Sequence, residues 1–124
     1  MSSIKLLLPI SAKYLELILR GEKMVEFRKQ NFNQNISEIL FFQTKSKGGV
    51  IVSSEVFGIE RLGYEEAWRK YAAIAGVSRE EFTSYIGSSA MVTCLALRLP
   101  IVILPVSLKD FGISRSPQGG KYIL

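Results

Sequence analysis

The sequence lacks histidine altogether and contains one cysteine, Cys94. Without histidine the chain cannot build a Ser-His-Asp triad, a Cys-His dyad or a histidine-ligated metal site. A lone cysteine excludes a disulfide framework and a zinc site of several cysteines, and Cys94 is expected in the core because it lies in an apolar run. We therefore expect no metal and no other cofactor, and any catalysis must use Lys, Glu, Asp, Tyr, Thr or Ser.

The sequence also lacks any segment typical of a signal peptide or a transmembrane helix. Its first apolar run is short and is followed by Pro9, and the longer run over residues 90–108 contains Arg98, Pro100 and Pro105. The charge, the prolines and the β-branched residues favour buried strands over a membrane helix. We expect a cytoplasmic protein without a membrane partner, present as a monomer or a weak dimer.

Length and composition suit a single small domain spanning residues 1–124. The chain has 124 residues, and its hydrophobic content of 48% is enough to bury one continuous core. The 16 Lys and Arg residues outnumber the 11 Asp and Glu residues, so the net charge is +5. This mild excess favours a polyanionic partner, although many basic proteins of this size do not bind nucleic acid.

Apolar periodicity predicts a mixture of helices and strands. Helical spacing indicates helices over 11–20, 64–75 and 78–86, and the last of them begins with a capping box formed by Ser78 and Glu81. Short apolar and β-branched runs indicate strands. These strands are predicted over 4–8, 24–28, 39–43 and 50–62, in the apolar run after residue 90, and at Tyr122 and Ile123.

Residues 21–28, Gly-Glu-Lys-Met-Val-Glu-Phe-Arg, carry the strongest functional signal in the sequence. Strand alternation places Glu26 and Arg28 on one face, and Lys23 lies just before the strand, beside a glycine turn. In such a cluster a lysine can lose its proton or a carboxylate can act as a base. The alternative is an exposed ion pair between Glu26 and Arg28 with Lys23 simply solvated, and periodicity does not distinguish the two.

A basic, glycine-ended turn is a second candidate site. Lys45, Ser46 and Lys47 precede two glycines, and the backbone amides of such a turn can contact phosphate together with the lysines. A solvated hairpin is the alternative, and the spacing does not match a Walker motif. A comparable basic turn over 115–121 is predicted to border the same groove.

Glu55 and several aromatic residues complete the candidates. A charge in the middle of a strand is costly if it is buried unpaired, so Glu55 is expected in solvent or, as a second option, paired with a cation of the 21–28 segment. Phe32 lies in a polar loop and is the preferred candidate for stacking on a base. Trp68 and Tyr85 belong to the apolar faces of two successive helices, so both are expected to point inward.

The pattern Gly-x-Lys-x-x-Glu-x-Arg, placed between an amphipathic helix and a strand, resembles the signature of the ASCH domain family. The resemblance continues through the strand at 39–44, the helical insert at 65–85 and the ending at 116–122. It implies an α+β fold, a PUA-like small β-barrel with flanking helices and a cleft between helix and barrel. It also implies that Lys23, Glu26 and Arg28 line that cleft, and that the partner is RNA or a nucleotide-like ligand.

Some small members of this family are amidohydrolases that remove the acetyl group from acetylated cytidine with a lysine, a threonine and a glutamate. Lys23 matches the lysine, whereas Glu26 occupies the position of the threonine, and the third residue has no clear match. We therefore rank an RNA-binding or nucleotide-binding module first. A metal-independent hydrolase of acylated nucleosides or RNA, with Lys23 and Glu26 as proton-transfer groups, comes second, and a protein-interaction accessory domain third.

Overall fold

The computed structural model describes residues 4–32, 35–43, 50–87, 91–102 and 121–123. Its elements, in chain order, are β1 (Ile4–Ile10), α1 (Ala12–Leu19), β2 (Val25–Arg28), β3 (Ile36–Gln43), β4 (Val50–Gly63), α2 (Tyr64–Tyr71), η1 (Ala72–Ile74), α3 (Arg79–Ile86), β5 (Met91–Val102) and β6 (Lys121–Ile123). The predicted phosphate-contacting turn with Lys45, Ser46 and Lys47 lies outside the described residues. None of the helices in the described ranges is long and apolar enough to cross a membrane.

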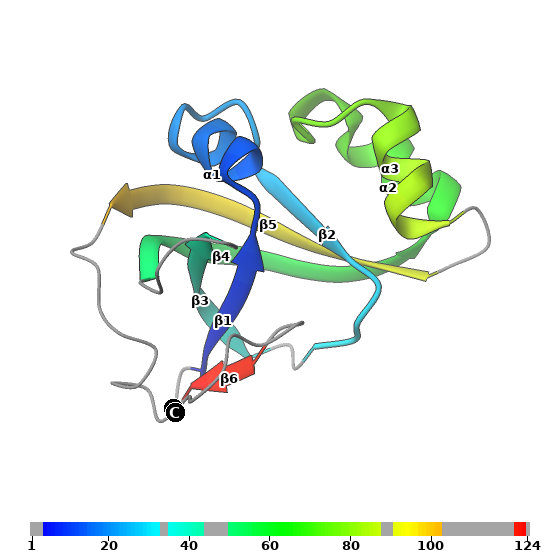
Figure 1. The fold of residues 1–124 in the computed structure, drawn as a ribbon. Helices are drawn as coiled ribbons and strands as arrows, with labels where there is room; N and C mark the ends of the chain where they lie inside the picture. Colours follow the sequence, from blue (N-terminus) through cyan, green and yellow to red (C-terminus); the bar gives the residue numbers. More distant parts are fainter. Residues whose placement is uncertain (1–3, 33–34, 44–49, 88–90, 103–120, 124) are drawn as a thin grey trace.

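The strands of the described ranges form one mixed sheet in the order β2-β5-β4-β3-β1-β6 (Figure 1). β1 and β3 run parallel, and the other neighbouring strands are antiparallel. The sheet curls into a half-barrel, and Figure 1 shows α1 and the pair α2 and α3 at the same end of it. The predicted α+β architecture, a small barrel-like sheet with flanking helices, is confirmed.

Two hydrophobic clusters make up the core. The first draws on β1, β3, β4 and β5 and receives Leu15 and Ile18 from α1. The second lies beneath the helices that follow β4, where Phe82 and Ile86 of α3 join Phe27 of β2. Because apolar burial is the main force holding a helix on a sheet, α1 is anchored by one cluster and α3 by the other. The pocket described below lies between these two helices.

Two prolines lie inside strands. Pro9 was predicted to end the first strand, but β1 continues to Ile10. In the described residues, β6 pairs with β1 only as far as Leu7, and from Leu8 onward β1 pairs with β3 alone. Proline has no N–H donor, and it is tolerated in a strand that pairs on one side only. Pro100 of β5 lies next to a break in register with β4, another position where proline is tolerated.

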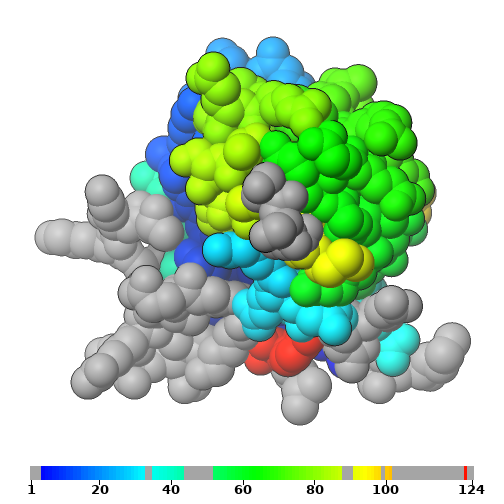
Figure 2. All heavy atoms as spheres, turned by 90° about the vertical axis from the view of Figure 1, so that its right-hand side faces the viewer, coloured from blue at the N-terminus to red at the C-terminus, as the bar shows by residue number. Residues whose placement is uncertain are grey.

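The segment that follows β2 folds back against β6. Phe32 is 5% exposed and meets Tyr122 edge-on, with ring centroids 6.4 Å apart. In the space-filling view of Figure 2 the cyan atoms of this segment lie directly above the red atoms of β6. Because β2 and β6 are the two edges of the sheet, this contact helps to close the half-barrel. The prediction that Phe32 is available for base stacking is therefore wrong.

Candidate functional site

A pocket of about 310 Å³ opens between α1, α3 and β2. Its size falls within the roughly 300–1,000 Å³ that is usual for small-molecule sites. The lining residues come from the end of β1, from α1, from β2 and the turn before it, and from α3 and the loop before it. They are Pro9, Ile10, Ser11, Tyr14, Lys23, Glu26, Phe27, Arg28, Val77, Glu81, Phe82 and Tyr85. The structure thus brings Lys23, Glu26 and Arg28 together on one pocket wall.

A glycine turn places Lys23 at the entrance of β2. Gly21 has φ +75°, which a glycine adopts without strain and which ends α1. The backbone N–H groups of Glu22 and Lys23 then donate to the carbonyl of Leu17 at 2.9 and 3.1 Å. The chain reverses tightly at this point, so the residues that follow enter β2 beneath α1.

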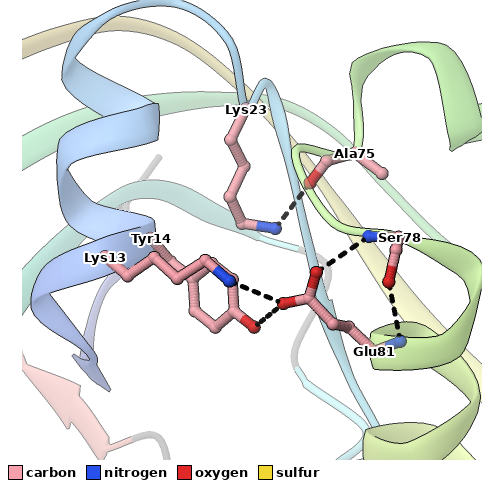
Figure 3. Close-up of polar contacts among 6 residues, drawn as sticks. All are labelled: Lys13, Tyr14, Lys23, Ala75, Ser78 and Glu81. Atoms are coloured by element: carbon pink, nitrogen blue, oxygen red, sulfur yellow. Dashed lines mark hydrogen bonds and ion pairs between the residues drawn. The ribbon is translucent and has the colours of Figure 1, made fainter.

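Lys23 is held from several sides and is only 3% exposed. Its Nζ donates to the carbonyl of Ala75 at 2.9 Å (Figure 3). The same atom lies 3.4 Å from Oε1 of Glu26. The same Nζ lies 5.6 Å from the centre of the Tyr14 ring. A Cβ at Gly76 would come within 2.6 Å of the Cβ of Lys23, so only glycine lets the loop before α3 approach this closely. The alternative of a solvated Lys23 is wrong.

Glu26 and Arg28 form a buried ion pair beside it. Arg28 Nε donates to Glu26 Oε2 at 2.8 Å, and Nη2 lies 2.6 Å from the same oxygen. Nη2 also donates to the carbonyl of Pro9 at 2.6 Å, which links β2 to β1 across the open side of the half-barrel. The side chains are 11% (Arg28) and 9% (Glu26) exposed, so the expected shared face is confirmed and the alternative of an exposed pair is wrong.

The pKa values of this pair follow from burial and mutual attraction. Burial favours the neutral form of Glu26, but the charges of Arg28 and Lys23 and their hydrogen bonds outweigh it and lower the pKa. Burial acts against the charge of Arg28 as well, but attraction to Glu26 leaves its pKa raised. Each partner therefore stabilises the ionised form of the other.

Tyr14 and Glu81 connect α1 to α3 across the pocket. The Tyr14 hydroxyl donates to Glu81 Oε2 at 2.6 Å, and Lys13 Nζ approaches the same oxygen to 3.1 Å (Figure 3). Oε1 of Glu81 accepts from the N–H of Ser78 in the predicted capping box, which is confirmed. The hydrogen bond from Tyr14 is the main reason that the pKa of Glu81 falls to about 2. The same bond is the main reason that the pKa of Tyr14 rises to about 12.

Tyr14, Glu81 and Tyr85 also line the candidate pocket, and sequence reasoning missed them. Glu81 carried a helix-capping signal only, and Tyr14 carried none. Tyr85 was expected to point inward, but it is 53% exposed and lines the pocket. The long separation between Tyr14 and Glu81 in the chain explains why no local pattern shows their contact.

Other candidates lie away from the pocket. Glu55 is exposed, as first expected, and its carboxylate pairs with Arg98 at 3.0 Å rather than with Lys23 or Arg28. Trp68 is half-buried against the second hydrophobic cluster, and Cys94 is fully buried there, as predicted. Burial raises the pKa of the Cys94 thiol to about 12. Within the described ranges, no group of three or more Cys, Asp or Glu residues is placed to hold a metal ion.

The arrangement is suited to hydrogen bonding more than to proton transfer. Glu26 and Glu81 are acceptors with lowered pKa values, and the Tyr14 hydroxyl keeps its proton well above neutral pH. A general acid or base works best when its pKa lies near the working pH, and none of these three groups meets that condition. Fixed donors and acceptors beside aromatic walls can instead recognise the edge and face of a planar ligand.

Comparison with known proteins gives concordant results for family and fold. A family model described as the ASCH domain matches residues 8–99. The fold is similar to that of ASCH from Zymomonas mobilis, with a TM-score of 0.84 and 21% identity over 97% of this chain and 87% of that one. A tyrosine-to-phenylalanine variant of the same protein matches with a TM-score of 0.84, 22% identity and 97% and 90% coverage. These likenesses confirm the predicted PUA-like fold, whereas no curated protein sequence matches the chain.

Proposed function

Because the chain belongs to the ASCH domain family, we propose that it is an RNA-binding module whose pocket holds one nucleotide unit of the RNA. Lys23, Glu26 and Arg28 form the inner wall of this binding site, and Tyr85 contributes an aromatic side chain at its exposed side. The family is generally inferred to bind RNA, and the proposal applies that inference to this particular pocket.

The observation that carries the proposal is a buried charge cluster that faces a cavity. Charged side chains are almost never buried unless they are paired, and a buried ion pair is often no more stabilising than apolar residues of similar volume. Lys23 and Glu26 are 3% and 7% exposed, yet both line an open pocket of ligand size. A cluster that is expensive to bury and is turned toward a cavity favours ligand recognition over a purely structural role.

The pocket walls supply the aromatic surface that a base requires. Tyr14 of α1, Phe27 of β2 and Phe82 and Tyr85 of α3 all line the pocket. Stacking of a base on an aromatic side chain contributes about 1–3 kcal/mol and depends little on base identity. The polar groups of Glu26 and Arg28 lie beside this aromatic surface and can hydrogen-bond the edge of the base.

Phosphate contacts in this proposal come from basic residues beyond the pocket. The net charge of +5 favours a polyanion, and Lys45, Ser46 and Lys47 are proposed to contact the RNA backbone together with the basic residues of the tail. Because such contacts release counterions, we expect RNA affinity to fall as salt concentration rises.

The test compares two exposed aromatic residues of the protein. Fluorescence anisotropy with a labelled, short single-stranded RNA should show that Tyr85→Ala weakens binding by about tenfold through lost stacking. Phe57→Ala is the matched control, because Phe57 is 59% exposed on β4 and does not line the pocket. Equal affinities for wild type and both variants would contradict the assignment of the pocket as the RNA site.

A hydrolase is the second candidate function, supported by Lys23 Nζ at 3.4 Å from Glu26 in the pocket wall. The lowered pKa of Glu26 and its place at the threonine position of the amidohydrolases weigh against this function. Incubation of the protein with RNA and with acylated nucleosides, followed by mass spectrometry, separates the two functions. Turnover by wild type that is lost in Lys23→Met would favour the hydrolase.

A further inference from the structure

The charges that line the pocket are balanced, although the chain as a whole is basic. Two cations, Lys23 and Arg28, and two carboxylates, Glu26 and Glu81, lie in its wall. The chain as a whole carries a net charge of +5. The positive excess that would attract a phosphate is therefore located elsewhere on the protein.

Both pocket cations are already engaged with partners in the wall. Lys23 Nζ contacts the Ala75 carbonyl and Glu26, and the Arg28 guanidinium contacts Glu26 and the Pro9 carbonyl. A phosphate that recruited either cation would have to compete with these contacts. It would also approach the carboxylate of Glu26, which accepts from both cations.

Glu81 places a second negative charge on the opposite wall of the same pocket. Its carboxylate is fixed by the Ser78 backbone and the Tyr14 hydroxyl, and its lowered pKa keeps it ionised across the physiological range. Lys13 offsets this charge only in part, because its side chain is 67% exposed and does not line the pocket. The pKa of Tyr14 is raised first by its hydrogen bond to Glu81, then by burial and by the charges of Glu81 and Glu26, so both carboxylates act on the same region of the pocket.

We propose that the pocket admits an uncharged base and excludes phosphate, with Glu81 as the residue that determines this specificity. The inference rests on the proposed RNA-binding function and identifies which part of the nucleotide enters. The base lies between the aromatic walls and the Glu26–Arg28 pair. The sugar-phosphate backbone stays outside, so the pocket accepts a base turned out of a single strand and disfavours a free mononucleotide.

The experiment uses competition against a labelled single-stranded RNA bound to the full chain. One competitor is an equimolar mixture of the four ribonucleosides, and the other is an equimolar mixture of their 5′-monophosphates. For wild type the nucleosides should displace the RNA at about three- to tenfold lower concentration, as expected for repulsion between like charges a few ångströms apart in a partly hydrated site.

Two glutamine variants isolate the contribution of Glu81. Glu81→Gln removes the charge but keeps a side chain that completes the capping box, so α3 should remain folded. Glu80→Gln changes the net charge by the same amount on the same helix, but Glu80 is exposed and does not line the pocket. The preference for nucleosides should disappear in Glu81→Gln and persist in Glu80→Gln.

The remaining outcomes would overturn the exclusion of phosphate, the entry of the base into the pocket, or RNA binding itself. Monophosphates that compete better than nucleosides, or an unchanged preference in Glu81→Gln, would overturn the exclusion of phosphate. If neither mixture displaces bound RNA, the base does not enter this pocket and the inference fails, while RNA binding by the chain stands. If wild type binds no RNA at all, the proposed function itself is wrong.

Discussion

Two arginine–glutamate pairs of this protein share an Nε–carboxylate contact of similar length and have opposite surroundings. Arg28 Nε lies 2.8 Å from Glu26 Oε2 in the pocket wall, and Arg98 Nε lies 3.0 Å from Glu55 Oε2 on the outside of the sheet. The side chains of the first pair are 11% and 9% exposed, whereas those of the second are 57% and 49% exposed. The two pairs therefore differ much more in burial than in the length of this shared contact.

Burial changes what each pair does for the protein. Water screens the outer pair, so its net contribution to stability is of the order of 0–1 kcal/mol. The inner pair is screened much less, and each partner depends on the other because an uncompensated buried charge is strongly unfavourable. The outer pair can therefore be replaced with little loss of stability. The inner pair holds β2 against β1 and also forms part of the pocket wall.

Replacing the glutamate of each pair with alanine should give the largest difference in lost stability between the two pairs. Glu26→Ala leaves Lys23 and Arg28 buried without their carboxylate and should lower the free energy of unfolding by about 3–5 kcal/mol. Glu55→Ala leaves an exposed Arg98 and should lower it by less than about 1 kcal/mol. Urea unfolding followed by circular dichroism measures both values. A similar, small loss in the two variants would mean that water reaches the inner pair.

Replacing the arginine of each pair with lysine should give a smaller difference in lost stability between the two pairs. Arg28→Lys keeps the charge but loses the planar fork that reaches both Glu26 and the Pro9 carbonyl, at a cost of about 1–2 kcal/mol. Arg98→Lys keeps an exposed charge near Glu55 and should change stability by less than about 0.5 kcal/mol. The same urea measurements apply, and a neutral Arg28→Lys would show that the fork is dispensable.

Local features of the fold were predictable from the sequence because they depend on neighbouring residues. The capping box of Ser78 and Glu81 and the end of α1 at Gly21 both follow from residue types a few positions apart. The shared face of Glu26 and Arg28 follows from strand alternation in the same way. The curl of the sheet and the position of Phe32 do not, because they arise when distant strands meet at the closing edge.

The candidate site was predictable only in part for the same reason. The sequence identified Lys23, Glu26 and Arg28 but left open whether they were buried. The partners that enclose them are distant in the chain: Lys23 donates to the Ala75 carbonyl, 52 residues away, and Arg28 donates to the Pro9 carbonyl. Tyr14 meets Glu81 across a separation of 67 residues, and only the packing of α1 and α3 on separate clusters brings these two side chains together.

Lowering the pH should cause the smallest of these losses in stability, because it protonates Glu26. Its pKa is lowered in the folded protein from an ordinary value of 4.5, so the unfolded chain takes up a proton first as the pH falls. The resulting stabilisation is complete above the unfolded pKa and is lost as the pH drops through the folded one. Between pH 7 and pH 4 this loss is at most about 1 kcal/mol.

Comparison of wild type with Glu26→Gln isolates this titration from that of the other carboxylates. The glutamine variant keeps the shape of the side chain and has no proton to take up at this position, so the stability advantage of wild type should shrink as the pH falls. Urea unfolding at several pH values between 7 and 4 measures the change. A difference that stays constant over this range would mean that Arg28 and Lys23 do not lower the pKa of Glu26.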